Sequence, residues 1–197
     1  MNGWRLTGVI SLLLVAMAAG FLAFRPDVDG LRLVIRATAR TSLVLFALAF
    51  SAAALVQLVP SEATRWQRCN RRYLGVSFAV SHAIHLAALI ALARTDDELF
   101  WTLTTPSIAL AGMAYLFIAA MTATSFDRTA AWLGARRWRL LHLVGGWYVW
   151  VSFAVAVGKR VPQGPIYWVM TALVIAVAVA RLVAMSRRSR AVLGTSG

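Results

Sequence analysis

The sequence predicts an all-α membrane protein, a bundle of six transmembrane helices with both termini in the cytoplasm. Of the 197 residues, 60% are hydrophobic and only 14% are charged, and the mean hydropathy is +0.73, far from the average of soluble domains. The apolar residues fall in continuous runs of about 20, the helical length that crosses about 30 Å of hydrocarbon. These runs must be helices, because lipid offers the backbone no hydrogen-bond partners.

Six such runs fill the chain as a single transmembrane domain over residues 1–197. The predicted helices cover about residues 4–24, 41–60, 73–93, 101–123, 138–157 and 165–185. The first run could be mistaken for a secretory signal, but it exceeds the usual apolar core of about 7–15 residues, and we expect an uncleaved spanning helix. The short basic tail, residues 186–197, is expected to be a disordered anchor at an anionic leaflet.

The positions of the basic residues predict the orientation. With the N-terminus inside, 13 of the 20 Lys and Arg residues lie in cytoplasmic segments, in agreement with the positive-inside rule. The first predicted loop opposes this orientation, because it holds four arginines on the outside. We expect residues 31–40 to form a short interfacial helix whose arginines lie at the headgroups, which reduces the conflict. The net charge of +13 therefore suits a membrane surface, and nucleic acid is not an expected partner.

Several cofactor classes lack the residues they need. Cys69 is the only cysteine, so neither a disulfide within the chain nor a cysteine metal cluster can form. A glycine-rich phosphate loop and a dinucleotide fingerprint are both missing, so flavin or nicotinamide chemistry would need another chain. The predicted helix cores contain no Asp or Glu, which disfavours a proton pump or cation transporter.

All three histidines, His82, His85 and His142, lie inside predicted spans. A membrane histidine is costly unless it binds something, and a haem iron needs only an imidazole and an apolar slot. The alternative is a packing histidine that bonds to a neighbouring helix. His82 and His85 are three residues apart and share one helix face.

Short motifs around these histidines resemble those of ferric reductase-like transmembrane proteins. They are Arg71-Arg72-Tyr73-Leu74-Gly75, Ser81-His82-Ala83-Ile84-His85-Leu86, Thr124-Ser125, Leu133-Gly134 and Arg137-Trp138-Arg139-Leu140-Leu141-His142. Over about residues 35–160 the chain is most similar to the haem-binding subunits of bacterial periplasmic methionine sulfoxide reductases, and the third helix is also similar to that of NADPH oxidases.

The resemblance implies a haem b protein of the bacterial inner membrane, with His85 and His142 as axial ligands to the iron. Such a subunit has no catalytic residues of its own. It passes electrons from a reduced flavin or quinone to an acceptor, through a redox partner protein in the periplasm or the cytoplasm.

One position departs from the family, whose members carry a second histidine where this chain has Val155. We take Arg71, Arg72 and Arg139 to mark one cytoplasmic level. Helical rise then puts His85 about 20 Å and His142 about 5 Å from that level, whereas two axial nitrogens on one iron lie about 4 Å apart. His82 is about 4.5 Å nearer that level than His85, so it differs less in depth from His142, but still by too much for one iron. We therefore do not expect His85 and His142 to share one haem.

Two questions stay open at this stage. The other ligand of His85 is unassigned, with Met113 as a candidate donor and core packing as its alternative role. Three functions fit the sequence: an electron-transferring subunit, a haem-poor assembly or interaction subunit, and a small-molecule or ion transporter.

Overall fold

The computed structural model describes residues 2–104 and 108–194, and over these ranges the chain is helical without a β-strand. Its helices are α1 (Trp4–Phe24), α2 (Val28–Leu58), α3 (Glu62–Cys69), α4 (Arg71–Thr95), α5 (Asp97–Thr104), α6 (Ile108–Ala123), α7 (Asp127–Leu133), α8 (Ala135–Gly158) and α9 (Pro165–Gly194), with a 3-10 turn at Val161–Gln163 before α9. The predicted all-α class is confirmed.

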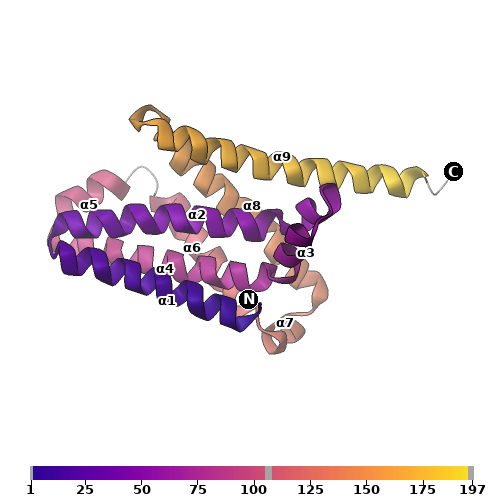
Figure 1. Cartoon of the computed structure of the whole chain (residues 1–197), viewed down its shortest axis with the longest axis horizontal. Helices are drawn as coiled ribbons and strands as arrows, with labels where there is room; N and C mark the ends of the chain where they lie inside the picture. Colours follow the sequence, from indigo (N-terminus) through magenta and orange to yellow (C-terminus); the bar gives the residue numbers. More distant parts are fainter. Residues whose placement is uncertain (1, 105–107, 195–197) are drawn as a thin grey trace.

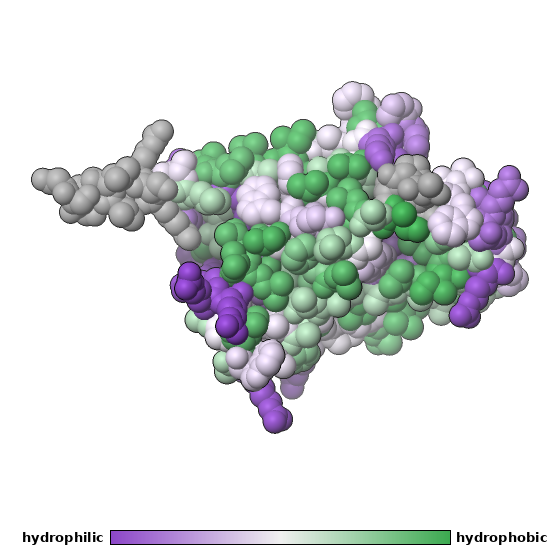
Figure 2. Space-filling view, turned by 180° about the vertical axis from the view of Figure 1, so that it is seen from behind, coloured by the Kyte–Doolittle hydropathy of each residue, from purple (hydrophilic) through white to green (hydrophobic). Residues whose placement is uncertain are grey.

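Five helices, α1, α2, α4, α8 and α9, are long and apolar enough to cross a membrane. The pair α6 and α7, bent by 107°, is a sixth candidate span. Figure 2 shows apolar side chains over the middle of the molecule and hydrophilic ones toward its ends. This distribution supports a multi-pass membrane protein, with five to six helices able to span.

The long helices lie side by side, and α2 packs against α1, α4 and α9, while α8 packs against α6 and α9 (Figure 1). The N-terminus, α3, α7 and the C-terminal end of α9 lie toward the same end of the bundle, and α5 lies at the other end. We call the end that carries α3 and α7 the basic end, because Arg68, Arg71 and Arg72 lie there.

Helix α2 corrects the sequence prediction. The expected interfacial helix at 31–40 and the expected span at 41–60 are one continuous helix of 31 residues, Val28–Leu58. Asp27 caps it, accepting a hydrogen bond from Gly30 N at 3.0 Å, and a Cβ on Gly30 would collide with the Arg25 carbonyl. No breaker follows before Pro60, and the threonines and serines of its first half bond to helix carbonyls or to α4, so the helix continues.

Three other boundaries differ from the predictions. The run at 101–123 is divided into α5 and α6, with residues 105–107 outside the described part. The basic second loop is a short helix, α3, because Ser61 and Thr64 form a reciprocal capping box at its start. Helix α9 continues to Gly194, so most of the expected disordered tail is helical, and residues 195–197 lie outside the described part.

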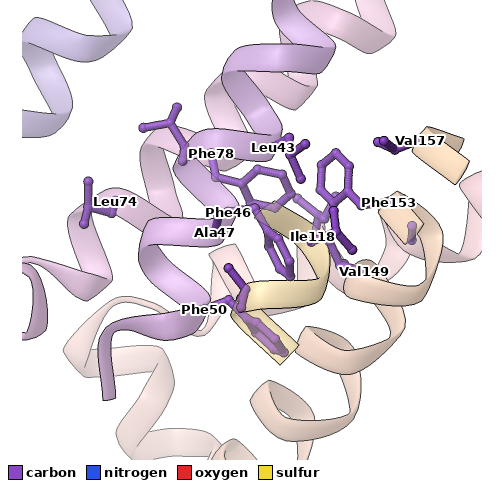
Figure 3. Close-up of a cluster of buried hydrophobic side chains, with 14 of the residues drawn as sticks. Leu43, Phe46, Ala47, Phe50, Leu74, Phe78, Ile118, Val149, Phe153 and Val157 are labelled. Atoms are coloured by element: carbon purple, nitrogen blue, oxygen red, sulfur yellow. The ribbon is translucent and has the colours of Figure 1, made fainter. Parts of the chain in front are cut away.

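A cluster of aromatic rings forms the centre of the bundle (Figure 3). The Phe46 ring lies 5.0 Å from Phe50, 5.4 Å from Phe78 and 5.3 Å from Phe153. Since these residues come from α2, α4 and α8, the cluster holds together the three helices that carry or face the histidines.

Candidate functional site

His85 points from α4 toward α2, where its orientation is fixed. Its Nδ1 lies 3.1 Å from the Ile35 carbonyl oxygen and 3.0 Å from Thr38 Oγ1. A carbonyl only accepts, so Nδ1 carries the hydrogen and donates it. The Thr38 hydroxyl donates its own hydrogen to the Val34 carbonyl at 2.6 Å, which leaves its oxygen to accept from the imidazole.

The other nitrogen of His85, Nε2, is consequently unprotonated in the neutral ring. It has no hydrogen-bond partner within residues 2–104 and 108–194. Histidines that bind metals commonly donate their second ring N–H to a carbonyl in this way, which sets the tautomer and raises the basicity of the ligating nitrogen. In the neutral ring His85 therefore presents Nε2 as an unprotonated nitrogen with a free lone pair.

Buried hydroxyls of α2 and α4 hold this region together. Ser81 Oγ lies 2.9 Å from both Thr41 Oγ1 and Ser42 Oγ, and it donates to the Thr38 carbonyl at 3.3 Å. Thr38, Ser42 and Ser81 are fully buried. Hydrogen bonds between helices are a main way that apolar segments associate in lipid, so the backbone around His85 is rigidly placed.

His82 lies beside His85, with ring centroids 5.4 Å apart. Its other neighbours are the rings of Tyr115 at 4.8 Å, Phe78 at 5.3 Å and Phe153 at 5.9 Å. His82 Nδ1 and the Tyr115 hydroxyl are both buried without a hydrogen-bond partner in the described part of the chain. Such orphaned polar atoms are rare in native structures and indicate a place for water or a ligand.

His142 lies in a different place from the other two histidines. Its ring stacks on Trp138 at 4.2 Å, and its Nε2 lies 3.3 Å from Thr124 Oγ1. It lines a cavity of about 320 Å³, which His82 and His85 do not line. The structure brings His82 and His85 together and leaves His142 apart, in agreement with the depth argument from the sequence.

This cavity, the basic-end cavity, lies among α2, α3, α4, α6, α7 and α8. Its lining residues are Phe46, Ala49, Phe50, Arg68, Cys69, Arg71, Arg72, Gly75, Phe78, Ile118, Met121, Thr122, Thr124, Ser125, Asp127, Ala130, Trp138, His142 and Gly146. Its volume lies at the lower end of the range of small-molecule sites, about 300–1,000 Å³. Cationic groups thus border an otherwise mostly apolar chamber.

Three residues near these sites were not identified from the sequence. Thr38 and Tyr115 had no signal, because only the rotation of α2 and α6 relative to α4 brings them to the histidines. Arg181 of α9 donates to the Phe50 carbonyl at 2.9 Å and places its guanidinium 3.9 Å from the Phe50 ring centre.

Met113, the candidate second ligand of His85, is 45% exposed. Tyr115, two residues further along α6, is the side chain that packs beside His82. On α8 the ring that reaches His82 belongs to Phe153, two residues before Val155, the position where the family has its second histidine. These placements bring neither Met113 nor Val155 to the histidine pair.

No group of three or more His, Cys, Asp or Glu side chains that could hold a metal ion occurs in the described residues. Comparison of the chain with protein-family models, with curated proteins and with solved structures finds no match.

Proposed function

We propose that this chain is a ferric reductase-like subunit of the bacterial inner membrane that binds b-type haem and relays electrons. The observation that carries the proposal is the state of His85, whose Nδ1 donates to the Ile35 carbonyl at 3.1 Å. That bond leaves Nε2 with a free lone pair, which is what an axial ligand of haem needs. The resemblance of the short motifs around His85 to those of ferric reductase-like proteins also supports the proposal.

The proposal includes six spans and cytoplasmic termini. Both chain ends lie toward the basic end of the bundle in Figure 1, as an even number of crossings requires. The positive-inside rule assigns this end to the cytoplasm. A reduced flavin or quinone would donate electrons from outside the chain, since the sequence holds no nucleotide-binding motif.

Haem would supply a one-electron redox couple, and the residues of the chain would hold and orient it. His85 would bind the iron, with Thr38 and the Ile35 carbonyl fixing its ring. His82 and Tyr115, with their orphaned polar atoms, would face the same region. His142 is a second proposed axial ligand, and because it lies at the basic-end cavity it would serve a separate site.

A haem-poor assembly or interaction subunit is the second candidate. The rings of Phe78, Tyr115 and Phe153 surround His82 at 4.8–5.9 Å, and Val155 stands where the family has a histidine. Such packing favours a bundle that retains the fold of the family without its cofactor.

Haem content of the purified chain separates the two candidates. The chain is expressed with haem supplementation, and reduced-minus-oxidised spectra and pyridine haemochrome quantification are recorded for the wild type, His85→Ala and His142→Ala. We expect a Soret band in the wild type, loss of the haem held by His85 in His85→Ala, and retention of that haem in His142→Ala. Size-exclusion chromatography checks that each variant is folded. A colourless wild-type protein would refute the haem proposal.

A further inference from the structure

The basic-end cavity contains more positive charge than the chain itself neutralises. Arg72 pairs with Asp127 at 2.7 Å, and Asp127 is the one carboxylate among the lining residues. Arg68 and Arg71, which also line the cavity, form no ion pair with any residue of the described part. Two guanidinium groups therefore border the chamber without an anionic partner from the protein.

The remaining wall has the opposite character. Phe46 and Phe50 of α2, Phe78 of α4 and Met121 of α6 line the interior, and Phe46, Phe50 and Phe78 are part of the buried core. An occupant must therefore combine an anionic group at the arginines with an apolar body. A free inorganic anion would satisfy only the first requirement.

The location of the cavity narrows the chemistry further. It lies at the basic end, between helices that cross the bilayer in our proposal, beside the short helix α3. Basic pockets between transmembrane helices on the cytoplasmic side are places where anionic lipid headgroups bind. The planar guanidinium of arginine donates two parallel hydrogen bonds to a phosphate, which fixes the headgroup in register.

We propose that the basic-end cavity binds one anionic phospholipid, with its phosphate on Arg68 and Arg71 and an acyl chain along the wall of Phe46, Phe50 and Met121. This site is separate from His85, so the proposal is independent of haem at His85, and it is the alternative to a haem at His142, which lines the same cavity.

Native mass spectrometry of the delipidated protein in detergent tests this site. The protein is titrated with dioleoylphosphatidylglycerol, which is anionic, and with dioleoylphosphatidylcholine, which is zwitterionic. We compare the wild type with the double variant Arg68→Gln/Arg71→Gln. The matched control is Arg136→Gln/Arg137→Gln, which removes the same charge from exposed positions of α8 that do not line the cavity.

We expect the wild type to retain one phosphatidylglycerol in preference to phosphatidylcholine. The affinity should fall roughly 25-fold in Arg68→Gln/Arg71→Gln, the product of about fivefold for each cationic contact, and should hardly change in the control. Equal losses in both double variants would overturn the proposal, since they would mean general attraction to a basic surface. Equal retention of both lipids would also overturn it.

Two further measurements show whether the bound anion is a lipid or free phosphate, and whether the cavity binds lipid independently of haem. Millimolar inorganic phosphate should not displace the lipid, and displacement by phosphate alone would point to a soluble anion and overturn the lipid assignment. Lipid retention in His85→Ala is expected to equal that of the wild type even if no haem binds. Displacement of the lipid by added haem would overturn the proposal, because the cavity would then belong to the cofactor.

Discussion

At the scale of single residues, the structure assigns Thr38 a specific task. Its hydroxyl oxygen lies 3.0 Å from His85 Nδ1 and is held there because its hydrogen goes to the Val34 carbonyl. The variant Thr38→Val keeps the shape of the side chain and removes that acceptor. Loss of a partner of this kind lowers metal affinity by about 10–100-fold. For the haem that we propose at His85 we expect the lower part of that range, because the Ile35 carbonyl remains.

The measurement is haem titration followed at the Soret maximum, together with the midpoint potential of the bound haem. Thr41→Val is the matched control, because Thr41 bonds to Ser81 Oγ at 2.9 Å and makes no hydrogen bond to His85. Nitrogen chemical shifts of the His85 ring in the haem-free protein give an independent readout, and in Thr38→Val the Nδ1 signal should shift because this N–H keeps only the Ile35 carbonyl as an acceptor. Identical haem affinity and potential in both variants would contradict a positioning role.

At the scale of helices, Gly145 sets the distance between α8 and α6. A Cβ at this position would lie 3.0 Å from both Met121 Sδ and Phe117 Cδ1, and small residues of this kind allow membrane helices to approach closely. We expect Gly145→Leu to destabilise the bundle by about 1–3 kcal/mol through overpacking, seen as a lower melting temperature in detergent.

Gly112 of α6 provides the comparison, because nothing lies within 4 Å of its Cβ position. Replacing an interior helical glycine there gains helix propensity, by up to about 1 kcal/mol. Gly112→Leu should therefore melt at or above the wild-type temperature. An equal fall for both variants would show that the close contact of α6 and α8 is not what limits stability.

The helices also show what the sequence could and could not predict. Most of the long apolar helices were predictable, because hydrocarbon thickness and backbone hydrogen bonding fix their length and type. The continuity of α2 was not, because the arginines within residues 31–40 suggested an interfacial segment. Thr38 and Ser42 are buried, and together with Thr41 they bond to carbonyls of their own helix and to α4. Which face of a helix meets which neighbour depends on packing, and sequence periodicity in uniformly apolar helices carries little of that information.

The same limit applies to the candidate site. His82 and His85 were predicted to share a face of one helix, and the structure places their rings 5.4 Å apart. The separation from His142 followed from helical rise alone. Tyr115, Thr38 and the basic-end cavity depend on how α2, α6 and α8 are rotated against α4, so composition and spacing gave no signal for them.

At the scale of the whole molecule, the single cysteine allows a direct test of orientation. Cys69 is exposed at the end of α3, toward the basic end, whereas the exposed Asp97 begins α5 at the opposite end (Figure 1). With both termini in the cytoplasm, a membrane-impermeant maleimide should label Cys69 in inside-out vesicles and leave it unlabelled in right-side-out ones. The double variant Cys69→Ser/Asp97→Cys should show the reverse pattern, because an odd number of crossings separates the two positions. Labelling of both positions from the same side would contradict the path of α4 through the bilayer, and an exchange of the two patterns would mean that the basic end faces away from the cytoplasm.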